Sequence, residues 1–389
     1  MGDRYPIQDQ VAIVGLGYTP YSRDSQKSPM GLVADAARSA IRDAGLTAKD
    51  IDGIAGYGLR PDLVQGALGI PEVTYYLQTT LPPFFQQMFA AMHAVHAGMC
   101  ETALVYHVAF LGPHNSRAAA GDPFRQPRGG RSGLTPGTPW PDSIMGTACY
   151  ATWGRRYLHE YNRTREDFGY IAINNRTNAM ANEHAISRTP ITMDDYLSAR
   201  MVRDPLTVYD MDFPVDGAEA VVVTTAERAK DLPKPPVLLH AAAEGQTKHA
   251  VEEEMPDLRH QGQQVAVKNL WARTDRTIED VDLFLPYDGF SPISIGWIES
   301  IYCGPGEGGA FIQDNWNKEA NRLEIGGRVL MNSHGGSMSD GASQGAGHTR
   351  EAILQLRGEA GVRQIDGVKH ALVTPGGYFF NAAAFLLRT

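Results

Sequence analysis

Two nine-residue stretches, LTAKDIDGI at 46–54 and RTIEDVDLF at 276–284, carry the same pattern of side chains. Each contains a threonine, an aspartate three residues later, a branched apolar residue and a second aspartate, and each runs on into apolar residues. Apolar residues at helical spacing precede both stretches, so each reads as a helix, a short acidic turn and a strand. The Asp-(Ile/Val)-Asp triplets lie 230 residues apart (280 − 50). The repeat predicts two halves built on one plan, with chance recurrence of a common turn as the alternative.

Outside these stretches, strands alternate with helices over most of the chain. Short apolar runs at 11–15, 221–225, 237–239, 371–374 and 379–387 are typical of buried strands and, with the helices between them, predict an α/β fold. The segment 112–206 differs, because six prolines between 113 and 141 exclude a long strand, and helices are expected at 146–161 and 167–182. We therefore expect an N-terminal half at 1–111 and 207–245, a loop-and-helix insertion at 112–206, and a C-terminal half at 246–389.

Composition excludes several classes of protein. The 389 residues have a formal net charge of −9 and no Lys/Arg stripe, so we expect no nucleic-acid partner. Cys100, Cys149 and Cys303 are far apart and form no CxxC pair, which argues against a disulfide framework and against a bound metal. Residues 1–10 do not resemble a signal peptide, and no apolar stretch reaches the roughly 18 residues of a membrane span. We expect a soluble, cytoplasmic protein with no membrane contact.

A GxG sequence after the first strand invites a dinucleotide-binding interpretation. Gly15-Leu16-Gly17 follows the apolar run at 11–15, but Pro20 stands where the third glycine belongs and the helix begins too late. We therefore reject a Rossmann-type site.

Four segments resemble one known family in order and spacing. They are GTACYATWGRRYLHEYNRTREDFGYIAINNRTNAMA at 146–181, VDGAEA at 215–220, NSHGG at 332–336 followed by Gly341 and Gly345, and TPGG at 374–377. Together they resemble the motifs of the thiolase superfamily over nearly the whole chain. Within it, PYDGFS at 286–291, IYCGPGEG at 301–308 and QLRG at 355–358 resemble the sterol-carrier-protein-X and lipid-transfer branch, some of whose members are steroid side-chain aldolases.

The resemblance carries expectations that composition and periodicity do not. It implies a thiolase-like five-layer αβαβα fold with two similar halves, and a homodimer. It implies a substrate carried as a coenzyme A thioester, with no separate cofactor. It also implies a partner protein that carries an OB-fold and zinc-ribbon acyl-CoA-binding module.

The groups with which thiolases transfer acyl chains are missing. The segment that matches the nucleophile's position, LQTTLPPFF at 77–85, has no cysteine, GAS at 341–343 replaces the Gly-His-Pro of the family, and Thr374 replaces its second cysteine. Thr80 is a hydroxyl candidate, but it needs an adjacent base, and a helix cap or a pocket wall is the simpler interpretation. Cys303 lies outside the nucleophile's position, and we interpret it as structural. Cysteine-dependent thiolase chemistry is therefore not expected.

Retro-aldol cleavage needs fewer groups. A base removes the proton of a β-hydroxyl, the Cα–Cβ bond breaks, and hydrogen-bond donors hold the thioester enolate until it is protonated. Tyr287 is the first acid–base candidate, because it follows the apolar run 283–285 and the matching segment of the steroid aldolases carries a functional tyrosine. A structural tyrosine is the alternative. The resemblance also implies a second tyrosine where Ala342 stands, so the second proton-transfer group is left open.

His334 is the candidate substitute, because an imidazole exchanges protons near pH 7. Its neighbours Asn332, Gly335 and Gly336 are candidate ligand-binding residues, since glycine lets a backbone approach a ligand closely. Asp288 and His348 are further catalytic candidates. Alternatively, Asp288 orients Tyr287 or caps the next helix, and His348 caps a helix at 349–356.

A cluster of arginines lies in the insertion, at Arg117, Arg125, Arg128 and Arg131. Arg125 and Arg128 are candidates for binding the phosphates of coenzyme A, because arginine pairs with phosphate through two N–H groups. A solvated loop is the alternative. Tyr378 is a candidate for the pocket wall.

Three functions fit the sequence. The first is an aldolase acting on a β-hydroxyacyl-CoA with a bulky, steroid-like acyl group. The second is an acyltransferase with an unconventional nucleophile. The third is a non-catalytic subunit that keeps the fold as a binding platform.

Overall fold

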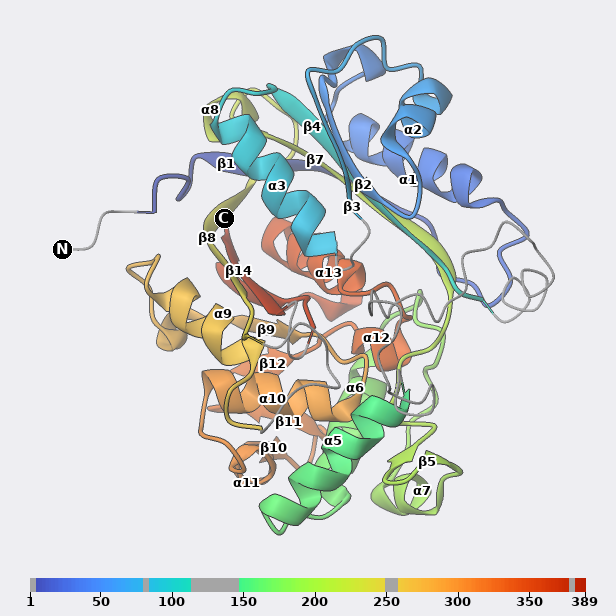
Figure 1. Cartoon of the computed structure of the whole chain (residues 1–389), viewed down its shortest axis with the longest axis vertical. Coiled ribbons are helices and arrows are strands. Elements are labelled where there is room, and N and C mark those ends of the chain that lie inside the picture. Colours follow the sequence, from blue (N-terminus) through green and yellow to red (C-terminus); the bar gives the residue numbers. More distant parts are fainter. Residues whose placement is uncertain (1–4, 80–83, 113–146, 249–257, 378–381) are drawn as a thin grey trace.

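The computed structural model of the chain describes residues 5–79, 84–112, 147–248, 258–377 and 382–389 (Figure 1). Its strands form one twelve-stranded mixed sheet, in the order β10-β11-β12-β9-β13-β14-β8-β1-β7-β4-β2-β3, and a separate two-stranded ribbon, β5-β6.

The N-terminal half contains five strands of the large sheet. Its elements are β1 (Val11–Tyr18), α1 (Pro29–Asp43), η1 (Ala48–Asp50), β2 (Gly53–Tyr57), α2 (Pro61–Leu68), β3 (Tyr75–Thr79), α3 (Phe84–His96), β4 (Thr102–Phe110), β7 (Asp216–Thr225) and α8 (Ala226–Ala229).

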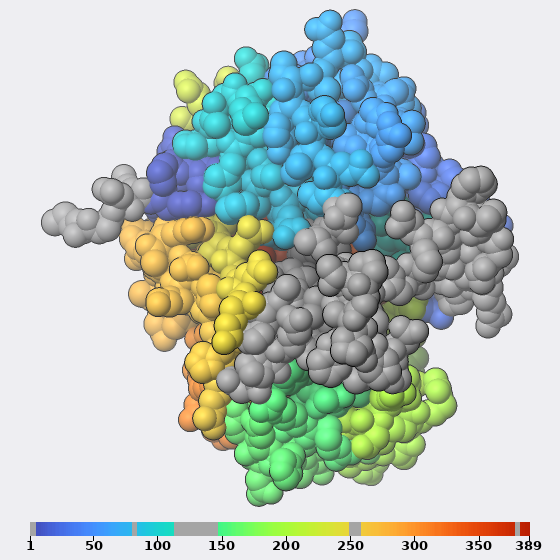
Figure 2. Space-filling view, in the orientation of Figure 1, coloured from blue at the N-terminus to red at the C-terminus, as the bar shows by residue number. Residues whose placement is uncertain are grey.

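The middle of the chain contributes mostly helices, as expected. Its described elements are α5 (Thr147–Glu160), α6 (Glu166–Ala179), α7 (Met193–Ser198), β5 (Met201–Arg203) and β6 (Leu206–Thr207). They lie at the end of the molecule opposite the N-terminal half, as the green and blue atoms of Figure 2 show.

The C-terminal half repeats the strand and helix order of the first. Its elements are β8 (Val237–Gly245), α9 (Gly262–Trp271), η6 (Ile278–Asp280), β9 (Leu283–Pro286), α10 (Ser291–Ile301), α11 (Gly308–Asp314), β10 (Trp316–Asn317), β11 (Arg322–Ile325), β12 (Val329–Met331), α12 (Gly336–Ser339), α13 (Ala346–Arg357), η7 (Gly361–Arg363), β13 (His370–Thr374) and β14 (Ala382–Arg388).

Strand order confirms the internal repeat. The N-terminal half runs β1-β7-β4-β2-β3 and the C-terminal half β8-β14-β13-β9-β12, and in both the first three strands are antiparallel and the last three parallel. The halves meet where β1 pairs with β8 through Ala12↔Leu238 and Ile13↔Val237. The domain boundary expected after residue 245 leaves β8 in the N-terminal half, whereas β8 pairs along its length with β14 of the C-terminal half.

The repeated acidic turns form the same hydrogen bonds in both halves. The backbone N–H groups of Thr47 and Thr277 each donate to the carboxylate three residues on, at 2.8 Å, and close matching 3-10 turns. The second aspartates fasten the start of the strand that pairs in parallel with the following one, β4 beside β2 and β13 beside β9. Asp52 accepts the N–H of Thr102 at the start of β4, and Asp282 accepts the N–H of His370 at the start of β13.

Three buried apolar clusters hold five layers of helices and strands together. α1 and α2 cover the outer face of the N-terminal strands, α3 and α13 lie between the two half-sheets, and α9 and α10, with α5 and α6, cover the outer face of the C-terminal strands (Figure 1). Glycines let a helix lie close to the first strand of each half. A Cβ on Gly17 would come 2.1 Å from the carbonyl oxygen of Ala36, and one on Gly245 would come 2.0 Å from that of Gly262. The arrangement is the expected αβαβα fold.

No helix in the described part of the chain is long and apolar enough to span a membrane.

Candidate active site

The site candidates of the C-terminal half gather where three parallel strands end. Tyr287 follows β9, Asn332 follows β12 and Thr374 ends β13, and these strands are neighbours in the sheet. Backbone bonds fix the three ends together, because Tyr287 N–H donates to the Thr374 carbonyl at 3.0 Å and Asn332 N–H to the Phe284 carbonyl at 2.9 Å. The Asn332 side-chain amide also donates to the Pro286 carbonyl, at 3.0 Å. The carboxyl edge of a parallel sheet is a common place for ligand sites.

Asp288 is buried in this site and accepts several hydrogen bonds. Its carboxylate accepts the N–H groups of Ser337 and Met338, at 2.7 and 3.0 Å, at the start of α12, and the side-chain amide of Asn175 at 2.7 Å. A Cβ on Gly336 would come 2.2 Å from the Asp288 carboxylate, so the close approach of α12 requires glycine there. Asp288 therefore caps α12; the expectation that it caps the next helix, which is α10, is wrong.

His348 is held by the same carboxylate. Its Nε2 lies 2.9 Å from Asp288 Oδ1, and because a carboxylate only accepts, Nε2 carries the proton and donates. The alternative that His348 caps its helix is wrong, since α13 begins at Ala346 with Gly345 as its cap and His348 lies within the first turn.

The rings of Tyr287 and His334 both lie beside that of His348. The ring centroids of Tyr287 and His348 are 6.0 Å apart, and those of His348 and His334 are 4.9 Å apart, both edge to face. The Tyr287 hydroxyl also lies 3.5 Å from a carboxylate oxygen of Asp212, at the limit of a hydrogen bond. Sequence reasoning missed Asp212, because no motif marks it and only the fold brings it to Tyr287.

Six buried polar atoms around these residues lack a hydrogen-bond partner in the described structure. They are both ring nitrogens of His334, Nδ1 of His348, Oδ1 of Asn332, Oγ of Ser337 and Oγ1 of Thr374. An unpaired buried polar atom is costly, and native proteins contain few. Their concentration at one edge of the sheet indicates a place where a polar ligand group supplies the missing partners.

The electrostatics favour neutral imidazole at the centre of the site. Burial, and then the neighbouring His348 and Arg350, hold the pKa of His334 well below its usual value near 6.5. His334 is therefore a neutral donor and acceptor in the resting protein, rather than a group that titrates near pH 7 as the sequence suggested.

None of the three thiols, all of which lie in the described part of the chain, is poised for catalysis. Burial raises the pKa of the Cys100 and Cys303 thiols to about 12, so neither is a thiolate at neutral pH. Cys149 is buried within α5. At the end of β13, the second cysteine position of the thiolase pattern carries the Thr374 hydroxyl.

A cavity of about 360 Å³ lies behind the His334 loop, which we define as residues 332–336. Ser333 and Arg363 contribute to its wall, together with residues of α6, β11 and β12, but Tyr287, His334 and His348 do not. An apolar pocket beside Tyr287 and His334, which a bulky acyl group would require, is a prediction. Thr80, Arg117, Arg125, Arg128, Arg131 and Tyr378 lie outside the described residues.

The fold and this site together define a thiolase-type protein without a nucleophilic thiol. Comparisons agree with that class. The family model for a thiolase C-terminal domain-like region matches residues 244–389. The 17-hydroxy-3-oxo-4-pregnene-20-carboxyl-CoA lyase of Mycobacterium tuberculosis is 32% identical over 385 residues, covering 95% of this chain and 97% of the relative. The steroid side-chain-cleaving aldolase of Thermomonospora curvata is also 32% identical, with 94% of each chain covered.

Solved structures give the same result. The structure described as an Ltp2-ChsH2(DUF35) aldolase matches with a TM-score of 0.84 and 29% identity, covering 98% of both chains. The chain thus belongs to the thiolase superfamily, in its carbon–carbon lyase group, the aldolases.

Proposed function

We propose that the protein cleaves a β-hydroxyacyl-CoA thioester with a bulky, steroid-like acyl group by a retro-aldol reaction. The observation that carries the proposal is the set of six unpartnered polar atoms beside Tyr287, in a site that lacks a thiol. Two 32%-identical relatives, a lyase and an aldolase, support the same reaction.

The reaction divides among the residues as follows. Tyr287 passes its own proton to Asp212, whose carboxylate oxygen lies 3.5 Å away and returns it at the end of the cycle, and takes the proton of the β-hydroxyl. The C–O bond becomes a carbonyl, the Cα–Cβ bond breaks, and its electron pair moves into the thioester enolate. Neutral His334 and the hydroxyls of Ser337 and Thr374 donate hydrogen bonds to the enolate oxygen. Protonation at Cα gives a shorter acyl-CoA and a ketone or aldehyde.

Asp288 acts through His348. By fixing the Nε2–H of His348, the carboxylate leaves Nδ1 as an acceptor on a side chain whose ring contacts both Tyr287 and His334. His348 in that tautomer is the group through which a proton passes from Tyr287 back to the enolate carbon.

We also propose a homodimer and a second protein partner. Among the described strands, β3 is the last of the sheet and pairs only with β2, and its Tyr76 is 69% exposed, which suits pairing with the same strand of a second copy. The name of the solved Ltp2-ChsH2(DUF35) aldolase pairs that protein with a DUF35 component. By analogy the partner here is an OB-fold and zinc-ribbon protein that presents the acyl-CoA, with Arg125 and Arg128 as candidates for its phosphates. Three free cysteines suit a cytoplasmic location.

The test is a product assay on the protein together with its partner. A β-hydroxyacyl-CoA with a steroid-like side chain is incubated with the complex, and acyl-CoA products and carbonyl compounds are quantified. Equal amounts of a ketone or aldehyde and an acyl-CoA shortened by the lost fragment are expected. Release of free coenzyme A without carbon–carbon cleavage would instead show hydrolysis or acyl transfer and overturn the proposal.

A further inference from the structure

A second buried cluster of charges lies beside the proposed site, in the layer between the two half-sheets. Arg350, on α13, is 4% exposed and is held between Glu219 of β7, at 3.1 Å, and Asp340, which follows α12. The Tyr21 hydroxyl donates to Glu219, and the guanidinium of Arg350 lies 4.8 Å from the centre of the Tyr21 ring. This Arg350 cluster contributes no group to the retro-aldol steps described above.

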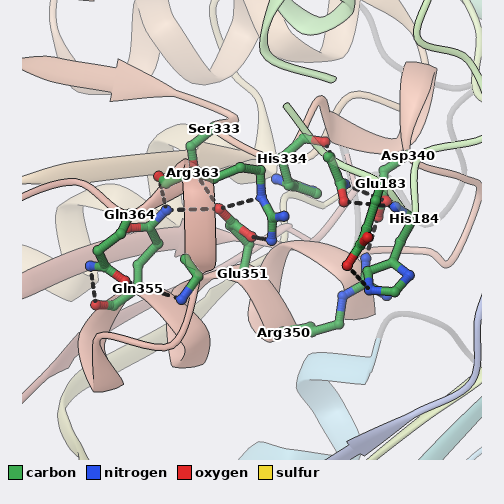
Figure 3. Close-up of polar contacts among 12 residues, drawn as sticks. Glu183, His184, Ser333, His334, Asp340, Arg350, Glu351, Gln355, Arg363 and Gln364 are labelled. Carbon is green, nitrogen blue, oxygen red and sulfur yellow. Dashed lines mark hydrogen bonds and ion pairs between the residues drawn. The ribbon is translucent and has the colours of Figure 1, made fainter. Parts of the chain in front are cut away.

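A chain of hydrogen bonds connects the Arg350 cluster to the His334 loop. The side-chain amide of Asn182 donates one hydrogen to Asp340 Oδ1 and the other to the His334 carbonyl, both at 2.9 Å. Figure 3 shows Arg350 and Asp340 on one side of His334, with Ser333, Glu351 and Arg363 on the other. On that second side, Ser333 donates to Glu351 at 2.8 Å, and Arg363 pairs with the same carboxylate.

Within the Arg350 cluster, Glu219 is the carboxylate with room for a proton. Its Oε1 accepts from Tyr21 and Arg350, but its Oε2 is buried and has no partner in the described structure. Asp340, in contrast, has both oxygens bonded, to Asn182 and Arg350. Two carboxylates share one guanidinium here, so the cluster carries one surplus negative charge when both are ionised.

We propose that Glu219, acting through Arg350, Asp340 and Asn182, positions the His334 loop for catalysis, and that protonation of Glu219 loosens it. The effect of Glu219 on turnover rests on the proposed function. Its effect on the stability of the His334 loop does not. Glu219 is thus a positioning residue, because each bond in the chain leads to the His334 carbonyl rather than to the substrate.

The chemistry of the cluster places this change near neutral pH. Burial raises the pKa of Glu219 to about 7, against the opposing effects of Arg350 and Tyr21. The other titratable groups facing the cluster are Tyr18 of β1, His107 opposite Glu219 on β4, and His184 beside Asp340 and Arg350. Burial holds the pKa of His107 at about 3, so His107 gains no charge between pH 6 and 8, and burial also lowers the pKa of His184 from its usual value of 6.5.

The direction of the pH dependence follows from the two ion pairs of Arg350. Above pH 7 Glu219 is ionised, Arg350 is paired with both Glu219 and Asp340, and the His334 loop is fixed in place. As the pH falls through about 7, Glu219 gains a proton and its attraction for Arg350 weakens. Both the protection of the loop and the rate of turnover should then decrease.

The experiment compares Glu219→Gln with Glu299→Gln. The amide introduced by Glu219→Gln can still hydrogen-bond to its neighbours but never ionises. Glu299 is the matched control, because it is also buried with its pKa raised to about 7, yet it binds the N–H groups of Gly306 and Gly308 instead. Two readouts are taken from pH 6 to 8.5: hydrogen exchange of a peptide covering 332–340, corrected for the intrinsic rate, and kcat/KM of the complex.

The expected results separate the two proposals. In the wild type and Glu299→Gln, loop protection should fall about tenfold from pH 8 to 6, as expected for one titrating group; in Glu219→Gln it should be low and independent of pH. Where wild-type turnover is measured, kcat/KM should follow the same pattern with KM little changed. An unaltered exchange profile in Glu219→Gln would overturn the inference. Inactive wild-type protein with the expected exchange would overturn only the proposed function.

Discussion

At the level of single residues, Asp288 holds the groups of the site together through its hydrogen bonds. It accepts four N–H donors, two from α12, one from Asn175 and one from His348. Asp288→Asn turns an acceptor oxygen into a donor in front of these N–H groups and should cost about 2–4 kcal/mol of unfolding free energy. Chemical denaturation measures this loss. Asp314→Asn, a change at a surface residue of α11, serves as control and should leave stability within about 0.5 kcal/mol.

His334 is predicted to act as a neutral imidazole. Because burial holds its pKa well below 6.5, its ring should stay unprotonated from pH 6 to 8. Imidazole NMR shifts of His334, assigned by comparison with His334→Gln, should therefore not change across this range. A titration midpoint between pH 6 and 7 would contradict the geometry, since it would require a solvated ring.

Glu299 gives a stability prediction with a defined sign. Burial raises its folded-state pKa from 4.5 to about 7, so the folded protein binds this proton more tightly than the unfolded chain. The stabilisation is complete below about pH 4.5 and is lost as the pH rises toward 7. Glu299→Gln should match the wild type near pH 5 and be more stable at pH 8, by on the order of 2 kcal/mol. Equal stability of the two proteins at pH 8 would show that the carboxylate is better solvated than the structure indicates.

Sequence motifs singled out four residues whose catalytic roles stay predictions, and the structure places these residues close together. Tyr287, Asp288, His334 and His348 are brought into one cluster, but the part each plays depends on contacts that sequence does not contain. Glu219 and Arg350 are 131 residues apart in their ion pair, so no local pattern could reveal them.

At the level of elements, the repeated acidic turn was the most informative sequence signal. The capping threonine and its aspartate form a local structure whose geometry depends on four residues, so sequence determines it well. The half to which β8 belongs was harder to predict from the sequence, because its pairing with β14 joins segments more than 130 residues apart. The short strands β10 and β11 and the ribbon β5-β6 carry weak patterns and were not predicted.

A substitution at the exposed edge of β3 tests the proposed dimer. Tyr76→Lys places a charge on that edge and should shift the 42.4 kDa chain from dimer to monomer in light scattering after size-exclusion chromatography. Val362→Lys, at an 89% exposed residue of η7, is the control and should remain dimeric. A dimeric Tyr76→Lys protein would mean that another surface forms the contact.

At the level of the whole molecule, the fold keeps the two-half plan of a thiolase while its chemistry has changed. The edge of the sheet that would hold thiols presents a phenol, two imidazoles and two hydroxyls. Intact mass spectrometry after exposure to an acyl-CoA should therefore show no covalent acyl adduct. An adduct mapped to a cysteine or to Thr80 would favour the acyltransferase alternative.

The most direct test of the account is the turnover of Tyr287→Phe beside Tyr302→Phe, assayed with the protein partner and a β-hydroxyacyl-CoA. Tyr302 is a half-buried tyrosine at the C-terminal end of α10 with a buried hydroxyl, so its loss controls for the removal of a phenol oxygen. The account predicts that Tyr287→Phe lowers kcat about 100-fold or more with little change in KM, while Tyr302→Phe stays near wild type. Wild-type kcat in Tyr287→Phe would contradict it.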